Sequence, residues 1–114
     1  MSDSRLSPSI EADSLIRRAQ QASGFGAVVR KGDAHRGSIL LLITDRGRHV
    51  ACLERQLSMG GDYVWTRAGP PADSAPQEVS EWTQKRVKFD EDVWLIELDI
   101  PHPEQFIVEI AAAG

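Results

Sequence analysis

The sequence predicts a single α+β domain, in which two helices pack on a mostly antiparallel sheet of four to six strands. Three observations lead to this fold class. A helical pattern opens the chain, four short strand patterns separated by turn residues follow, and a second helical pattern precedes a strong final strand. Strands joined by short turns pair as antiparallel hairpins, and helices at the two ends of such a run are expected to cover one face of the sheet.

The first expected element is a helix over residues 9–23. Its apolar residues follow the i, i+3, i+4, i+7 spacing of one helix face: Ala12, Leu15, Ile16, Ala19 and Ala22. Pro8 suits a first helical position, and either Ser7 or Ser9 can cap the helix. Gly24 is expected to end it.

Five strands are expected, four before the second helix and one after it. Residues 38–44 are aliphatic on both faces, which is typical of a central strand covered on both sides. In the last strand Trp94, Ile96, Leu98 and Ile100 alternate and therefore share one face. The expected strands are residues 25–30, 38–44, 49–55, 63–67 and 93–100.

The second helix is expected from Pro76 to about Lys88. Ser74 and Gln77 have the spacing of a capping box, and Pro is tolerated in a first helical turn. Three apolar residues of this helix are expected to be buried, namely Val79, Trp82 and Phe89.

The chain ends with a segment predicted as an additional strand, Phe106–Ile110. The predicted order is therefore α-β-β-β-β-α-β plus a C-terminal strand. An unpaired strand edge invites pairing with a second chain, so the sequence also suggests a homodimer through residues 106–110.

Length and composition indicate a small cytoplasmic protein. The chain has 114 residues, and we expect a mobile tail over residues 1–8 and one domain over residues 9–114. Its longest aliphatic run, Ile39–Ile43, is far shorter than the roughly 20 residues of a membrane helix. Cys52 is the single cysteine and cannot form an internal disulfide, which is consistent with a reducing cytoplasm.

Two blocks of the sequence carry a resemblance to a known family. The first runs from Arg17-Arg18-Ala19 through Gly24–Asp33 to Gly37–Leu41, and the second joins Lys85-Arg86 to the pattern Phe89-Asp90-x-Asp92-x-Trp94-Leu95-x-Glu97. Together they resemble a family of small bacterial proteins known as domain of unknown function 1491. The resemblance spans about residues 10 to 99, implies a stand-alone domain with no assigned reaction, and carries over no catalytic residue. The segment 106–110 departs from the family pattern.

Acidic residues gather where the second helix ends and the last strand runs. Asp90 and Asp92 lie in the corner, while Glu97 and Asp99 are two residues apart and share one face of the strand. If these four carboxylates converge, they can hold a divalent cation such as Mg²⁺ and support a metal-assisted hydrolase or nuclease. The other interpretation, which we favour, is an Asx-type turn with solvated acids, whose charge is offset by Lys85, Arg86 and Lys88 one helical turn earlier.

Cationic residues provide the other candidate site. The loop Arg30–Gly37 combines cations with flexible glycines, and the helix carrying Arg17 and Arg18 leads directly into the preceding strand, so a phosphate or another anion can be bound there. Nucleic acid is not expected, because the isoelectric point is 5.3 and no aromatic residue interleaves the cations. Arg86 lies on the apolar stripe of its helix, where it can pair structurally or meet an anion. The binding candidates are Arg17, Arg18, Arg30, Lys31, Asp33, Arg36 and Arg86.

The leading functional hypothesis is therefore a non-enzymatic binding or accessory module for a protein partner or an anionic small molecule. The sequence predicts no catalytic residue and no cofactor. The metal-assisted hydrolase that uses Asp90, Asp92, Glu97 and Asp99 is the alternative.

Overall fold

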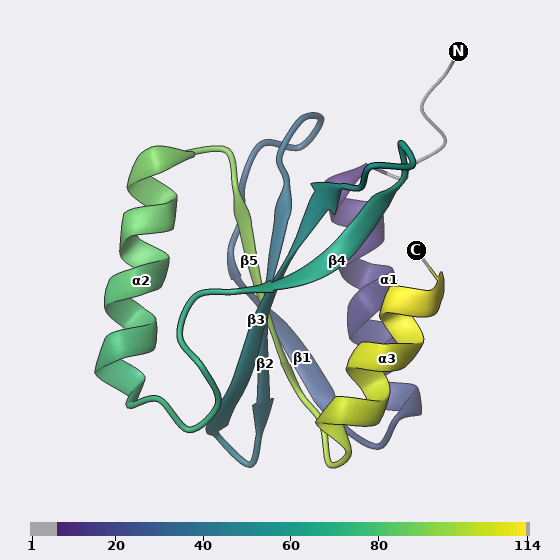
Figure 1. Ribbon diagram of the computed structural model, residues 1–114, viewed down its shortest axis with the longest axis vertical. Coiled ribbons are helices and arrows are strands. Elements are labelled where there is room, and N and C mark those ends of the chain that lie inside the picture. The colour runs from purple at the N-terminus through teal and green to yellow at the C-terminus, as the bar shows by residue number, and fades with distance from the viewer. Residues whose placement is uncertain (1–6, 114) are drawn as a thin grey trace.

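The computed structural model describes residues 7–113, which form three helices and a five-stranded sheet (Figure 1). The predicted α+β class is confirmed, and the first seven elements occur in the predicted order. The elements are α1 (Pro8–Gln21), β1 (Phe25–Arg30), β2 (Ile39–Asp45), β3 (Arg48–Leu57), β4 (Tyr63–Ala68), α2 (Pro76–Phe89), β5 (Trp94–Asp99) and α3 (Pro103–Ala113). Of the predicted N-terminal tail, residues 1–6 lie outside the described residues, and α1 already begins at Pro8.

The sheet has the strand order β1-β5-β2-β3-β4, so the last strand in the sequence is inserted between the first two. It pairs antiparallel with β1 and parallel with β2, and the remaining pairs are antiparallel. The mostly antiparallel sheet is thus confirmed. The parallel register places Ile39 beside Trp94 and Thr44 beside Asp99. β2 is central, as its aliphatic residues predict, and Leu40, Leu41 and Ile43 are fully buried.

Helices cover both faces of the sheet, not one face as the sequence pattern suggests (Figure 1). α1 and α3 lie on one face and enclose the larger core. Trp94, Ile96, Leu98 and Ile100 all point into this core, which confirms the predicted alternation along β5. α1 contributes Ala12, Leu15 and Ala19 to it, and α3 contributes Phe106, Ile107 and Ile110.

The opposite face is covered by α2 alone and has a smaller core. Leu40, Cys52, Val93 and Leu95 form it, and Val79, Trp82 and Val87 of α2 pack against them. Burial raises the pKa of the Cys52 thiol to about 12, which keeps it protonated and unreactive at neutral pH. The expected burial of Phe89 is wrong, because this residue ends α2 and its side chain is 90% exposed.

The predicted C-terminal strand is also wrong, since residues 106–110 belong to helix α3. Proline is favoured in a first helical turn, and Phe106, Ile107 and Ile110 have the i, i+1, i+4 spacing that places all three on one helix face. Their burial on the sheet holds α3 in place, so this segment offers no strand edge for a homodimer. Within residues 7–113, no helix is long and apolar enough to cross a membrane.

The helix ends differ in detail from the prediction. Ser23, with φ of +67°, adopts the left-handed conformation that ends α1, while the Gly24 amide donates to the Ala19 carbonyl. Gly24 is needed for another reason, because a Cβ there would lie 2.1 Å from the Asp99 carbonyl oxygen. At the start of α2 the Ser74 hydroxyl donates to the Pro71 carbonyl, so it does not cap the helix.

Candidate ligand-binding cavity beneath helix α2

A cavity of about 470 Å³ lies between the first half of α2 and the sheet. Pockets of this size hold small organic ligands. The sheet contributes Leu42, Thr44 and Glu97, and the helix contributes Val79, Ser80 and Thr83. The remaining wall comes from the start of β3 and the segment that leads into α2, including Arg48, His49 and Asp73.

The alternation of side chains along β5 explains why the cavity is partly polar. Val93 and Leu95 belong to the core beneath α2, and by the same alternation Glu97 and Asp99 face that side of the sheet. The face therefore changes from apolar to acidic along the strand. The cavity opens where the apolar contacts end.

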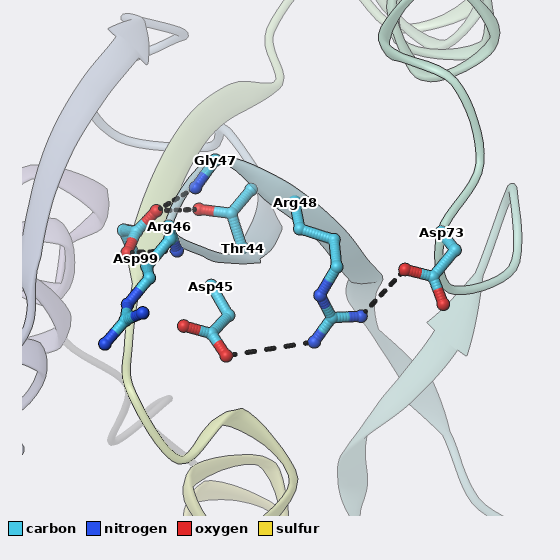
Figure 2. A network of polar contacts seen from close by, with 7 residues as sticks. All are labelled: Thr44, Asp45, Arg46, Gly47, Arg48, Asp73 and Asp99. Atoms are coloured by element: carbon cyan, nitrogen blue, oxygen red, sulfur yellow. Dashed lines mark hydrogen bonds and ion pairs between the residues drawn. The ribbon is translucent and has the colours of Figure 1, made fainter.

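The segment between β4 and α2 is bound to the start of β3 by two hydrogen bonds and one ion pair. Nε2 of His49 lies 3.0 Å from the Pro70 carbonyl oxygen, which can only accept, so Nε2 carries the proton. The Asp73 amide donates to the His49 carbonyl at 2.9 Å. Arg48 forms an ion pair with Asp73 at 3.0 Å and a longer one with Asp45 at 3.8 Å, and it lies between the two carboxylates (Figure 2). These contacts fix one wall of the cavity.

Asp99 is a buried carboxylate that holds the turn between β2 and β3. It accepts hydrogen bonds from the Thr44 hydroxyl at 2.8 Å and from the backbone amides of Arg46 and Gly47 at 3.0 and 2.9 Å (Figure 2). Burial by itself raises the pKa of Asp99, but the hydrogen bonds from Gly47, Thr44 and Arg46 outweigh it, and the pKa is lowered. The ionised carboxylate of Asp99 therefore has a structural role, since its three hydrogen bonds hold the turn.

Glu97 is in a different situation, although it is only two residues away. Its Oε2 lies 3.5 Å from the Thr44 hydroxyl, which has a single proton and lies only 2.8 Å from Asp99. We therefore infer that the Thr44 hydroxyl donates its hydrogen bond to Asp99 and not to Glu97. The residues paired with Glu97 on the neighbouring strands are Ala27 and Leu42, whose side chains have no donor. In residues 7–113, Glu97 has no cationic partner.

Other partly buried glutamates of the sheet and helices have partners, which makes Glu97 distinct. Glu11 of α1 pairs with Arg55, whose guanidinium also lies over the Trp65 ring at 4.3 Å. Glu54 of β3 pairs with Arg86 of α2 at 2.8 Å. The Arg86 contact is thus a structural pairing between α2 and the sheet.

The four acidic residues that the sequence proposes as metal ligands do not converge. Asp90 and Asp92 precede β5, whereas Glu97 and Asp99 lie near its end, and the seven residue-to-residue steps from Asp92 to Asp99 extend over roughly 23 Å. Asp90 accepts from the Asp92 amide at 3.1 Å and from the Ser38 hydroxyl at 3.3 Å, so it organises a turn. Among the described residues, no group of three or more His, Cys, Asp or Glu side chains could hold a metal ion.

Two of the loop residues proposed for ligand binding make structural bonds. Arg30 donates to the backbone carbonyls of Glu91 and Val93 at 3.0 and 2.8 Å. Asp33 accepts from the backbone amides of Arg36 and His35 at 2.7 and 2.8 Å, and these two bonds lower its pKa. The loop therefore closes on itself and on the corner before β5.

The remaining predicted cations are placed apart from the cavity. Arg17, Arg18, Lys31 and Arg36 do not line it, and none of them forms an ion pair with another described residue.

The loop and the corner before β5 fit closely, which brings together the two blocks that carry the family resemblance. The Asp33 amide donates to the Asp92 carbonyl at 3.0 Å, and the Trp94 indole donates to the Asp33 carbonyl at 2.8 Å. A Cβ at Gly32 or Gly37 would lie 2.0 or 2.3 Å from the backbone carbonyl oxygen of Asp92, so a side chain at either position would clash. These motif residues therefore have a structural role.

Sequence reasoning missed most of the cavity residues. Thr44 interrupts an aliphatic strand, and Thr83 lies on the inner side of α2, where it is 8% exposed. Both are polar residues on apolar faces, and this is the signal that could have identified them. Glu97 was identified as a candidate, but for metal binding.

The chain matches one protein family and is similar to solved structures of low sequence identity. The model of the family described as "Protein of unknown function (DUF1491)" matches residues 6–108. The crystal structure of a DUF1491 family protein from Caulobacter crescentus CB15 is 26% identical, with a TM-score of 0.74 over 85% of this chain and 90% of that one. The solution structure of protein Atu0922 from A. tumefaciens is 25% identical, with a TM-score of 0.70 over 83% and 86%. No curated protein matches the chain.

The family match extends beyond the region of the predicted resemblance. It reaches residue 108 and so includes the first part of the buried face of α3. The segment that seemed to depart from the family is thus largely inside it. The match covers far more than half of the chain, and we conclude that this protein belongs to the DUF1491 family, whose function is unknown.

Proposed function

We propose that this protein is a cytoplasmic, non-enzymatic binding module whose small-molecule ligand occupies the cavity beneath α2. One observation carries the proposal. The cavity has a volume of about 470 Å³, and Glu97 lines it with a carboxylate that has no cationic partner in the described part of the chain. Glu97 is only partly buried, so solvent can reach its carboxylate in the free protein, and a ligand that donates hydrogen bonds can replace that solvent.

The other polar groups of the cavity favour binding over catalysis, because they are already engaged in holding the structure. Asp99 accepts three hydrogen bonds, and His49 is bonded to the Pro70 carbonyl. The Thr83 hydroxyl donates to the Ser80 carbonyl of its own helix at 2.9 Å. A nucleophile needs a general base within hydrogen-bond reach. The Thr44 hydroxyl has the Asp99 carboxylate within that reach, but the hydrogen bonds that lower the pKa of Asp99 make it a weak base.

The proposal refines the hypothesis of a binding module by giving the site a location. Arg30, Asp33 and Arg86 make structural contacts, while Arg17, Arg18, Lys31 and Arg36 lie outside the cavity. The metal-assisted hydrolase is not proposed, because one pair of its carboxylates lies in the corner before β5 and the other near the end of that strand.

The proposal is tested by titrating the isotopically labelled protein with a library of small fragments and recording amide chemical shifts. We expect at least one fragment to shift signals of cavity residues such as Thr44, Val79 and Thr83 together. Ser80→Phe places a large side chain at the cavity wall and should abolish these shifts. Gln77→Phe is the matched control, because residue 77 is exposed on the same helix and does not line the cavity.

If fragments of every charge class leave the cavity signals unchanged in the wild type, or if Ser80→Phe and Gln77→Phe bind them equally well, the cavity is not a ligand site.

A further inference from the structure

We propose that the ligand of this cavity carries a cationic amine or amidine group, which binds to the carboxylate of Glu97. This inference rests on the proposed function and adds the chemical class of the ligand. It follows from the unmet hydrogen-bonding capacity of Glu97, the balance of charge around the cavity, and the apolar side chains beside it.

Glu97 is partly buried and can accept several hydrogen bonds, yet the neighbouring Thr44 hydroxyl already donates to Asp99. The Thr44 hydroxyl lies 2.8 Å from Asp99 and 3.5 Å from Glu97. An ionised carboxylate is an acceptor only, so its complement is a group that donates. An ammonium or amidinium group forms charge-assisted hydrogen bonds with it, which are shorter and stronger than those of a neutral donor.

The charged groups around the cavity leave no free cation for an anionic ligand. Arg48 is the cationic side chain among the lining residues, and Asp73 and Asp45 already flank its guanidinium at 3.0 and 3.8 Å. Asp99 lies beside Glu97 with its negative charge held by backbone amides rather than by a cation. The local field therefore favours a positive ligand and opposes a negative one.

The remaining lining indicates what the rest of the ligand resembles. Leu42 and Val79 offer apolar contact between the sheet and α2, and Val79 also packs on the smaller core. A ligand that joins a cationic head to a small flat or aliphatic body can place its head on Glu97 and its body against these two residues. Pockets with a mainly apolar lining and a few placed polar groups bind such molecules.

Three probes of nearly identical shape test the inference: benzamidine, benzamide and benzoate. Their dissociation constants are measured by chemical-shift titration at pH 7 with the wild type, Glu97→Gln and Glu78→Gln. Glu78 is exposed on α2 and does not line the cavity, so it controls for a general loss of negative charge. We expect benzamidine to bind the wild type at least tenfold more tightly than benzamide, and benzoate to bind most weakly. Glu97→Gln should remove the preference for benzamidine, and Glu78→Gln should retain it.

The outcomes separate this inference from the proposed function. If benzamide or benzoate binds in the cavity as tightly as benzamidine, or if Glu97→Gln retains the preference, the cavity is a ligand site but the cationic class is wrong. If none of the three probes shifts the cavity signals, the inference fails, and the fragment library then decides the proposed function independently. A denaturation curve of each variant is the control that it is folded under the conditions of the titration.

Discussion

Thr44 and Asp99 face each other across the parallel strands β2 and β5 and are joined by a hydrogen bond of 2.8 Å. This bond uses the single proton of the threonine hydroxyl, and the neighbouring Glu97 has only a longer contact of 3.5 Å with the same hydroxyl. The structure thus separates two carboxylates that are adjacent on one face of a strand. One anchors a turn, and the other is exposed to a cavity.

The first prediction concerns the cost of keeping Glu97 unpaired. Glu97→Gln should leave the free energy of unfolding unchanged or raise it by up to about 1 kcal/mol, because it removes a charge that has no partner. Glu54→Gln is the matched control, since it breaks the ion pair with Arg86 and should lower stability by about 1–3 kcal/mol. Urea denaturation at pH 7 measures both. Equal losses in the two variants would show that Glu97 also has a stabilising partner.

The second prediction concerns Asp99. Asp99→Asn should lower the free energy of unfolding by about 1–3 kcal/mol at pH 7, because hydrogen bonds to a charged acceptor are lost. The pKa of Asp99 is lowered in the folded chain, so its stabilisation is fully present above the unfolded value of about 3.9. That stabilisation disappears as the pH falls through the folded pKa. The difference between wild type and variant should therefore shrink below about pH 4, and a constant difference would contradict the assignment.

The third prediction concerns the contact between the β1–β2 loop and the corner before β5. Gly37→Ala should lower stability by about 1–3 kcal/mol, because the added Cβ would lie 2.3 Å from a backbone oxygen of Asp92. Gly60→Ala is the control, since its nearest neighbour would be 3.8 Å away, and it should change stability by less than about 0.5 kcal/mol. Thermal unfolding of both variants distinguishes the two positions. Similar melting temperatures would mean that the loop does not pack against Asp92.

The fourth prediction concerns α3, which the sequence pattern did not reveal. Ile110→Ala should cost about 2–5 kcal/mol, because Ile110 is 1% exposed in the larger core. Val108→Ala on the same helix should cost less than about 0.5 kcal/mol, since that side chain is 67% exposed. Denaturation curves test the pair. If both substitutions are neutral, α3 is not part of the core.

Local patterns predicted the fold class, and long-range placement limited what more could be predicted. The strand over residues 25–30 was predicted with its observed bounds because its β-branched residues lie between glycines. The insertion of β5 between β1 and β2 depends on contacts between distant segments, which no local pattern encodes. For that reason the coverage of both sheet faces was missed. The helical spacing of Phe106, Ile107 and Ile110 was present in the sequence, but the Pro101-His102-Pro103 interruption and the apolar residues favoured a strand.

The candidate site was predictable only in part for the same reason. The alternation along β5 correctly placed Glu97 and Asp99 on one face, and the acidic composition drew attention to both. Their different roles depend on the register between β2 and β5, which brings Thr44 beside Asp99. The cavity depends on the position of α2 and the fastened segment from Pro70 to Asp73. Neither can be inferred from spacing within one element.

A structure of the protein bound to benzamidine would show directly whether Glu97 binds a cationic group in the cavity. We expect the amidine group in the cavity beneath α2, with at least one of its nitrogens about 3 Å from a carboxylate oxygen of Glu97 and its ring against Leu42 and Val79. The Thr44 hydroxyl should keep its bond to Asp99 in this complex. Benzamidine bound elsewhere on the surface, or bound in the cavity with its amidine group turned away from Glu97, would contradict a role of Glu97 in binding a cation.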